Sequence, residues 1–265
     1  MTTYGTLDIR REGAVDWVTM NRPDRLNALD DAMVADLSAY FLALETDTSV
    51  RIVVLRGAGR AFCAGLDLAD ARADSDVATG LARQRAIAQI VMRMRRCPQP
   101  IVSLVHGPAC GGGFALALAS DIRIAGQSAR MNVAFIRIGL SACDIGVSYF
   151  LPRLVGVSIA SELMMTGNFI HADRALATGL VSQVVPDEEM EATVRPMLDA
   201  MLTTAPLGLR LTKECLRMSI DAPSLDSAIA MEDRNQMLCV ASPDFGEGVA
   251  AFLEKRRPSY AGEGA

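Results

Sequence analysis

Histidines, paired cysteines and an excess of positive charge are all missing or scarce in this sequence. Its 265 residues include two histidines, and none of its six cysteines forms a CxxC pair. A structural zinc site needs four clustered ligands of these types, so we expect no metal centre. Lys and Arg number 26 against 31 for Asp and Glu, which gives a net charge of −5. Because nucleic-acid binding normally requires a basic surface, this balance argues against a nucleic-acid partner.

Signals for export and for membrane insertion are also missing. The first residues, MTTYGTLDIRREGAVDW, lack a basic stretch followed by an apolar one, so we expect a cytoplasmic protein with free thiols. Residues 97–120 carry no charged side chain, but they include three prolines and a glycine triplet at 111–113. Since proline and glycine disfavour a spanning helix, this stretch is expected to form buried core and loop, with no membrane span.

The pattern of apolar residues in the first half predicts an α/β protein. Hydrophobic residues make up 51% of the chain and charged residues 22%, as in ordinary globular proteins. Runs rich in Val and Ile at 15–20, 51–55 and 101–105 predict strands, and the last two are apolar at nearly every position, as in strands covered on both faces. Apolar residues repeat at helical spacing over 33–44, and residues 78–95 are rich in Ala. Strands that alternate with helices indicate a sheet with crossover helices.

The second half of the sequence is expected to be mostly helical. From about residue 158 it contains short helical patterns, with one further strand candidate at 181–185. Gly167 and Gly179 lie where glycine commonly ends a helix. The sequence therefore predicts an α/β core followed by a helical C-terminal region. The helices expected there cover 187–202, 206–219, 224–238 and 243–257.

Two glycine-rich segments follow predicted strands. Residues 57–65 (GAGRAFCAG) have Phe62 where a dinucleotide-binding fingerprint needs its third glycine, and residues 106–113 (HGPACGGG) lack the Gly-Lys-Ser/Thr ending of a phosphate loop. We expect both segments to lead from a strand into a helix start, where backbone N–H groups lack partners. Two such N–H groups, placed together, could stabilise one developing oxyanion. The alternative is that the glycines only permit tight turns and close packing.

Six motifs, in one order along nearly the whole chain, carry a family resemblance: 21–29 (NRPDRLNAL), 59–68 (GRAFCAGLDL), 106–113, 121–125 (DIRIA), 146–156 (GVSYFLPRLVG) and 252–256 (FLEKR). The set resembles the crotonase superfamily, and within it the enoyl-CoA hydratase/isomerase group. The resemblance implies a crotonase-like α/β fold with a spiral core of ββα repeats at 1–200, and a helical region at 201–265 used for trimerisation and for covering CoA. It also implies an acyl-CoA thioester substrate, a homotrimer or hexamer, and no cofactor beyond the coenzyme A that is part of the substrate.

By motif position, the resemblance also implies which residues hold the substrate. Leu66 and Gly112 would supply the two backbone N–H groups that hold the thioester carbonyl. Glycine at position 112 suits a close approach of the thioester to the backbone. The other implied contacts with CoA are Arg25 near its phosphates, Leu26, Ala28, Ala64, Gly65, Asp67, Leu68 and, from a C-terminal helix over a neighbouring subunit, Phe252 and Lys255. For Arg25 and Lys255 the alternative is a solvated surface charge.

The chain departs from the family pattern at the two glutamates that hydration normally uses. Those positions hold Ala115 and Phe135, and neither side chain can hold a water or move a proton. A different acid, Asp144, stands in an apolar stretch, and its place resembles that of an active-site aspartate in dienoyl-CoA isomerases and 4-chlorobenzoyl-CoA dehalogenase. Burial would raise its pKa and suit it to proton transfer near neutral pH. The alternative is that Asp144 caps a helix over 145–151.

The remaining polar candidates are expected to be structural. Asp67 is expected to fix its loop through backbone hydrogen bonds, and Asp121 to have a structural role. His106 is expected to serve packing or a backbone contact. Cys63 and Cys143 flank the expected site and are expected to be small buried side chains.

These residues favour one reaction over two others and over a non-catalytic role. One acid beside an oxyanion hole suits migration of a double bond from the 3-enoyl to the 2-enoyl position, because hydration must also position a water. The alternatives are a hydratase that uses Asp144 with an ordered water, and a non-catalytic acyl-CoA binder. Dehalogenation ranks last among the reactions, because residues 84–92, where the family carries a histidine base, contain no histidine.

Overall fold

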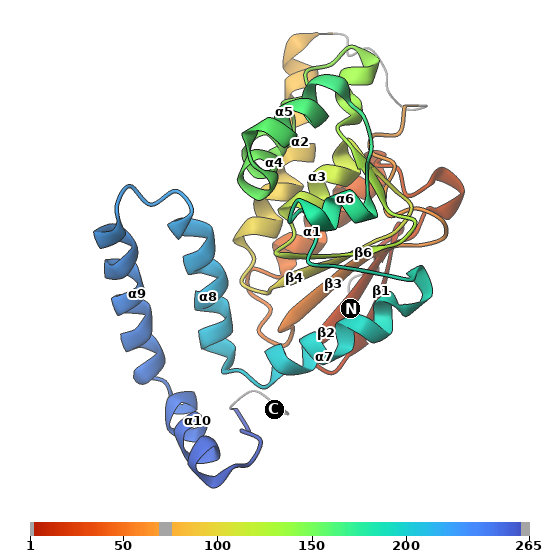
Figure 1. The fold of residues 1–265 in the computed structure, drawn as a ribbon. Helices are drawn as coiled ribbons and strands as arrows, with labels where there is room; N and C mark the ends of the chain where they lie inside the picture. Colours follow the sequence, from red (N-terminus) through yellow and green to blue (C-terminus); the bar gives the residue numbers. More distant parts are fainter. Residues whose placement is uncertain (1–2, 69–75, 261–265) are drawn as a thin grey trace.

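A six-stranded sheet forms the centre of the molecule in this computed structural model, which describes residues 3–68 and 76–260 (Figure 1). The strands lie in the order β1-β2-β3-β4-β6-β9, and neighbours are parallel except for the antiparallel pair β1 and β2. Three of the four predicted strands are present with nearly the expected bounds, whereas the fourth is shorter and begins at Gln183. The strands cover Leu7–Glu12 (β1), Val15–Met20 (β2), Ile52–Gly57 (β3), Ile101–Val105 (β4), Ile122–Gly126 (β6) and Gln183–Val185 (β9).

Helices cover both faces of this sheet (Figure 1). Because side chains alternate between the two faces of a strand, Val53 and Leu55 of β3 pack on one side, and Ile52 and Val54 pack on the other. The first side packs against α1, α2 and α3, and the second side packs against α7. This double covering explains why the central strands are apolar at almost every position. These helices cover Asp31–Ala43 (α1), Val77–Arg96 (α2), Gly112–Ala119 (α3) and Met190–Leu202 (α7).

A second, smaller sheet completes the repeating pattern of the core. It contains β5 (Pro108–Cys110), β7 (Arg130–Asn132) and β8 (Ile170–His171), in that order. Along the chain, β4, β5 and α3 are followed by β6, β7 and a 3-10 helix, η2 (Ala134–Ile138). In each repeat the first strand joins the larger sheet and the second strand joins the smaller one. This arrangement agrees with the ββα spiral that the resemblance implies.

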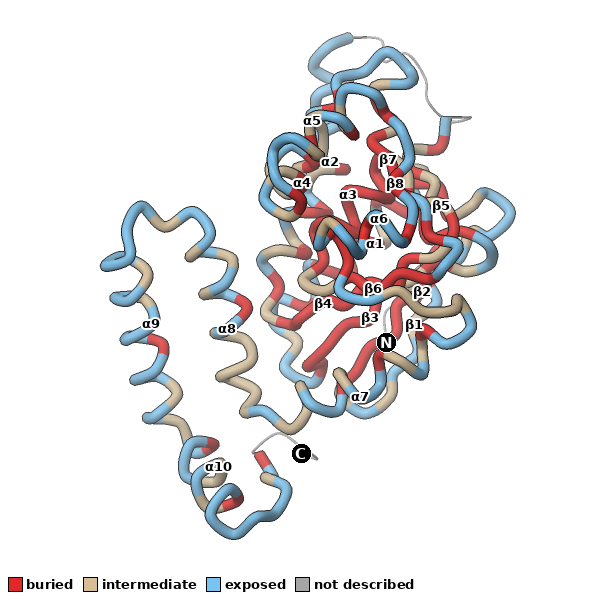
Figure 2. Tube along the Cα trace, in the orientation of Figure 1, coloured by how far each residue is buried: buried red, intermediate tan, exposed pale blue. Residues whose placement is uncertain are grey.

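Helices α8 to α10 project from the α/β body as an extended arm (Figure 1). Figure 2 shows that the core strands are buried, whereas most of this arm is exposed. The buried Lys213 of α8 fastens the start of the arm to the body, since its Nζ lies 2.9 Å from Asp121 Oδ2 and donates to Gln99 O at 2.7 Å. These helices cover Pro206–Ser219 (α8), Leu225–Val240 (α9) and Pro243–Glu254 (α10).

Three expectations about helices are corrected by the structure. The helix predicted over 187–202 is divided into a 3-10 turn and α7, and the helix predicted over 243–257 ends at Glu254. The helix predicted over 145–151 begins only at Val147, because Gly146 is its N-cap. The elements not yet named are η1 (Pro23–Arg25), α4 (Val147–Val155), α5 (Val157–Thr166), α6 (Ala172–Ala177) and η3 (Asp187–Glu189).

The uncharged stretch at 97–120 forms the buried centre of the molecule. It contains β4, β5 and all of α3, and every residue of α3 is buried. Within the part of the chain that the structure describes, no helix is both long enough and apolar enough to cross a membrane.

Candidate active site

The two glycine-rich segments each contribute to two separate cavities. Their first residues, 57–60 and 106–108, line a larger cavity of about 1130 Å³. Their later residues, 64–66 and 111–112, line a smaller cavity of about 110 Å³. The expected oxyanion residues, Leu66 and Gly112, therefore line the smaller cavity and not the larger one.

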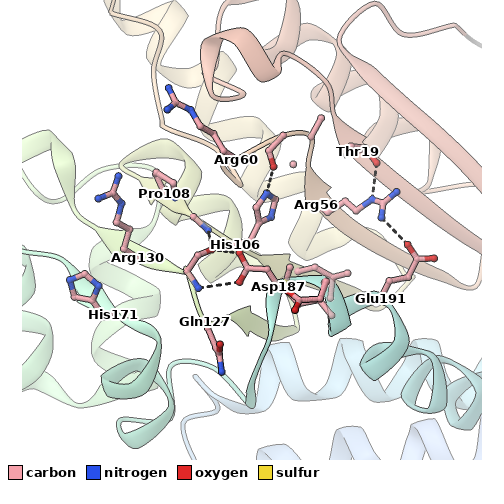
Figure 3. Close-up of a pocket in the computed structure, with 18 residues that line it drawn as sticks. Thr19, Arg56, Arg60, His106, Pro108, Gln127, Arg130, His171, Asp187 and Glu191 are labelled. Atoms are coloured by element: carbon pink, nitrogen blue, oxygen red, sulfur yellow. Dashed lines mark hydrogen bonds and ion pairs between the residues drawn. The ribbon is translucent and has the colours of Figure 1, made fainter.

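Many charged and polar side chains line the larger cavity, and several of them bond to one another or to the backbone (Figure 3). His106 Nε2 lies 2.8 Å from the carbonyl oxygen of Gly59, so the expectation of a backbone contact for this histidine is confirmed. Arg56 donates to Glu191 Oε2 at 3.0 Å. None of the residues expected to hold acyl-CoA is among the described residues that line this cavity.

The smaller cavity is apolar apart from one acid and one amide. The acid is Asp144, which is the only ionisable side chain among the described lining residues. The amide is that of Gln84 on α2. Backbone from both glycine-rich segments forms one wall. The described lining residues are Leu29, Ala64, Gly65, Leu66, Leu68, Gln84, Ile87, Gly111, Gly112, Ala134, Phe135, Ile138, Leu140, Asp144 and Ile145.

A β-bridge fixes the direction of the Leu66 N–H group. Leu29 N donates to Gly65 O at 2.7 Å, and Asp67 N donates to Leu29 O at 3.0 Å. In a parallel bridge of this kind the residue between the two bonds turns its own N–H away from the partner strand. The N–H of Leu66 is therefore free of Leu29. The expected helix start after this segment is wrong, because an extended bridge at Leu66 orients the N–H group instead.

The N–H of Gly112 is free for a different reason. Gly112 is the first residue of α3, where the N–H groups of the first turn have no partner inside the helix. In the described part of the chain neither this N–H nor that of Leu66 is paired with an acceptor. For the segment 106–113, the prediction that a strand is followed by a helix start is confirmed, because the segment follows β4 and leads into α3.

Two glycines allow the two segments to approach each other. Gly65 has a φ of +93°, a region that favours glycine, and a Cβ there would lie 2.6 Å from Cys110 O and 3.4 Å from Gly112 N. A Cβ on Gly112 would lie 2.8 Å from Leu29 Cδ1. Any larger residue at either position would push the segments apart or fill the cavity.

Asp144 also lines this cavity, and it lies in a strained turn. Its Oδ1 accepts hydrogen bonds from the N–H of Ile145 at 2.8 Å and from Nε2 of Gln84. Burial raises the pKa of this carboxyl above its ordinary value, although both hydrogen bonds act in the opposite direction. Ile145 has a φ of 46°, which a β-branched residue rarely adopts and which costs on the order of 1–3 kcal/mol. The alternative role for Asp144 as a helix cap is wrong, since its side chain bonds to the adjacent N–H and Gly146 caps α4.

Comparison with known proteins identifies the family of the chain. The sequence pattern of the family described as Enoyl-CoA hydratase/isomerase matches residues 10–263. The chain belongs to the enoyl-CoA hydratase/isomerase family. It is 37% identical to the 1,2-epoxyphenylacetyl-CoA isomerase of Escherichia coli K12 over 95% of this chain and 97% of that protein. It is 35% identical to the 2,3-dehydroadipyl-CoA hydratase of the same strain, over 97% of this chain and 98% of that one.

Solved structures of family members confirm the crotonase fold. The enoyl-CoA hydratase from Bacillus anthracis superimposes with a TM-score of 0.92 at 31% identity, covering 97% of this chain and 99% of that chain. The enoyl-CoA hydratase from Mycobacterium smegmatis gives a TM-score of 0.90 at 34% identity, over 96% and 98% of the two chains. The protein is therefore an acyl-CoA enzyme of the lyase or isomerase type.

The two positions where this family normally carries hydration glutamates are apolar in the folded chain. Ala115 is completely buried within α3. Phe135 lines the smaller cavity, and its ring lies 3.2 Å from the place that a Cβ on Gly111 would take. Asp144 is therefore the one side chain among the described lining residues that can take up or release a proton near neutral pH.

The loop expected to hold CoA is fastened by a residue that the sequence reasoning missed. Arg22 donates to Ala28 O at 2.6 Å and pairs with Asp67 at 3.2 Å and with Asp30 at 3.0 Å. Asp67 is thus held by an ion pair as well as through its backbone. Arg22 stands inside the 21–29 motif, but its role depends on a contact with Asp67, which is distant in the sequence.

The other expected CoA contacts fall into two groups. Leu26 lies beside the cavity wall, since Ala64 N donates to Leu26 O at 3.0 Å, whereas Arg25 in η1 is exposed. Phe252 and Lys255 belong to the arm, away from the cavity of their own chain, and Phe252 is 84% exposed (Figure 1). A single chain therefore does not bring all the expected contacts together.

Three residues expected to be structural can be placed. Asp121 accepts from the N–H of Ile101 at 2.8 Å, so its structural role is confirmed. Cys63 is completely buried, and this burial raises the pKa of its thiol to about 12. The expectation of a buried side chain is wrong for Cys143, which is exposed because it lies on the surface loop before α4.

Proposed function

We propose that the smaller cavity catalyses migration of a double bond in an enoyl-CoA thioester. The observation that carries this proposal is the combination of two free N–H groups, at Leu66 and Gly112, with one carboxyl, Asp144, on the lining of one small apolar cavity. An enolate needs donors at its oxygen and a proton carrier near its carbon atoms. No second acid is available among the described lining residues for the two-glutamate route to hydration.

In the proposed reaction the thioester carbonyl accepts hydrogen bonds from the N–H groups of Leu66 and Gly112. These bonds stabilise the negative charge that forms on the oxygen when a proton leaves C2 of a 3-enoyl substrate. The Asp144 carboxylate takes that proton and becomes a neutral acid. As the enolate collapses, a double bond forms between C2 and C3, the electron pair between C3 and C4 takes up the proton at C4, and Asp144 is ionised again.

Hydration is the second candidate, because a relative that is 35% identical is named a 2,3-dehydroadipyl-CoA hydratase. In that case Asp144 would act together with an ordered water, as the sequence alternative required. The relative named 1,2-epoxyphenylacetyl-CoA isomerase supports an isomerase instead. Dehalogenation is disfavoured further by the structure, since α2 presents the amide of Gln84 to the carboxyl and an amide cannot serve as a base.

We also propose that the CoA arm lies along residues 25–28 and 64–68, and that the region 201–265 assembles the chain into a homotrimer or hexamer around a core at 1–200. Support for the assembly comes from the large apolar side chains that helices α8 to α10 expose, among them Leu225 at 75% and Leu253 at 73%. Phe252 and Lys255 would then contact CoA bound to a neighbour. Light scattering on the purified protein tests the assembly, and a monomer would contradict it.

The reaction is tested by incubating 3-enoyl-CoA and 2-enoyl-CoA with the wild-type protein and with Asp144→Asn. Liquid chromatography with mass spectrometry then separates the products. We expect wild-type protein to convert the 3-enoyl compound into its 2-enoyl isomer without a change of mass, and the variant to do so far more slowly. A gain of about 18 mass units would assign hydration instead. Unchanged substrates that nevertheless bind in calorimetry would contradict both reactions.

A further inference from the structure

The two oxygens of the Asp144 carboxyl have different surroundings. Oδ1 accepts a hydrogen bond from the N–H of Ile145 at 2.8 Å and another from Nε2 of Gln84. Within residues 3–68 and 76–260, Oδ2 accepts no hydrogen bond. Gln84 and Asp144 come from different elements, α2 and the turn before α4, and both line the smaller cavity.

We propose that Gln84 is a positioning residue that holds Oδ1 of Asp144 and thereby leaves Oδ2 as the oxygen that carries the proton. This inference rests on the proposed function, and it adds which atom moves the proton and which side chain selects that atom. Gln84 acts through Asp144 and has no bond-making role of its own.

The chemistry of an amide suits this task. The Gln84 NH₂ group donates a hydrogen bond but cannot take up or lose a proton near neutral pH, so it does not compete for the proton in transit. A donor on Oδ1 stabilises the carboxylate form that must accept a proton from C2. When Oδ2 becomes protonated, Oδ1 is the carbonyl oxygen and still accepts both hydrogen bonds, so the acid does not rotate between the two proton transfers.

Charged groups around the cavity do not take over this role. Arg83 pairs with Asp31 at 3.4 Å, and Asp67 pairs with Arg22 at 3.2 Å. The causes that shift the pKa of Asp144 are burial and the hydrogen bonds from Ile145 and Gln84, in that order, with no charged neighbour among them. Among the described residues, the ionisable groups adjacent in sequence to lining residues include Asp30, Asp67, Arg83, Arg85, Arg137 and Cys143.

Backbone strain at the same turn gives independent support for a fixed carboxyl. Ile145 keeps a φ of 46°, although the strain would be relieved in an ordinary conformation. In the strained conformation its N–H reaches Oδ1, and its side chain lies within 3.7 Å of the place that a Cβ on Gly112 would take. The turn therefore places the side chain of Ile145, the residue after Asp144, next to Gly112.

The test compares Gln84→Met, which keeps the length of the side chain and removes the donor, with Gln89→Met, an exposed position on the same helix. We expect Gln84→Met to lower kcat by about tenfold to a hundredfold with little change in KM, and to move the acid limb of the pH profile to higher pH. Gln84→Glu should move the limb further, because two carboxyl groups would then share the site. Gln89→Met should match the wild type in both respects.

The outcomes separate this inference from the proposed function. An unchanged acid limb in Gln84→Met, together with an inactive Asp144→Asn, would overturn the positioning role and leave the reaction standing. Full activity in Asp144→Asn would overturn both. Since Gln84 is exposed on the helix surface, circular dichroism should show that the variants remain folded, which keeps the kinetic comparison valid.

Discussion

The two cavities differ in size and chemistry although the same two glycine-rich segments line both. The larger cavity, of about 1130 Å³, contains many ionisable side chains, and its His106 and Arg56 are engaged with neighbouring groups. The smaller, of about 110 Å³, offers two N–H groups without an acceptor and one acid in apolar surroundings, counted over residues 3–68 and 76–260. A low-polarity cavity strengthens each electrostatic interaction with a substrate. Catalytic capacity is therefore expected in the smaller cavity, where polar groups are few and the surroundings are apolar.

The largest expected difference between the cavities concerns their acids. Asp144→Asn removes the proposed proton carrier of the smaller cavity and should lower turnover by about 10²–10⁴-fold. Asp187→Asn makes the same change in the larger cavity, where Asp187 Oδ1 accepts from Ser128 N at 3.1 Å, a bond that an amide oxygen can keep. Steady-state kinetics should show unchanged turnover for this second variant. Equal losses in both variants would remove the distinction between the cavities.

A second comparison concerns glycine in the wall of the smaller cavity. In Gly112→Ala the new Cβ would lie 2.8 Å from Leu29 Cδ1 and occupy the space where the thioester must approach. We expect kcat/KM to fall by about 10²-fold, since a misplacement of about 1 Å has that effect. Gly246→Ala in α10 is the matched control, because a Cβ there meets nothing within 4 Å. Wild-type kinetics in Gly112→Ala would contradict the close approach.

The smallest expected effect is on stability, and it has the opposite sign to the effect on turnover. Burial raises the pKa of Asp144 in the folded state, so ionisation at neutral pH opposes folding. The penalty is present above the raised pKa and disappears as the pH falls below the unfolded-state value. Asp144→Asn should therefore raise the urea midpoint at pH 7 and lose this advantage at low pH. A lower midpoint at pH 7 would contradict the direction of the shift.

Much of the core could be predicted from the sequence because its elements are long and periodic. Residues 101–105 form a strand between two covered faces, and an uninterrupted apolar run is enough to predict that. The strands β5, β7 and β8 contain two or three residues each, so they have no period that a sequence could reveal. They form because the spiral brings their backbones side by side.

The candidate site was predictable only in part, for a similar reason. Asp144 is detectable because a lone acid in an apolar stretch is costly unless it is used. Gln84 lies one turn before Ile87, so helical spacing could place it on the inner side of α2. What it meets there depends on the turn at residues 144–146, which is about sixty residues away in the chain. The burial of Cys143 was mispredicted because the loop before α4 runs along the surface.

The most direct test of the central claim is deuterium uptake by enoyl-CoA in heavy water, followed by mass spectrometry. If Asp144 moves a proton between carbon atoms and exchanges it with heavy water over repeated turnovers, wild-type protein should add at least about one mass unit to the acyl group, and Asp144→Asn should add none over the same time. Asp187→Asn should behave like the wild type. Uptake at the wild-type rate in Asp144→Asn would show that another group carries the proton, and the assignment of the smaller cavity would then be wrong.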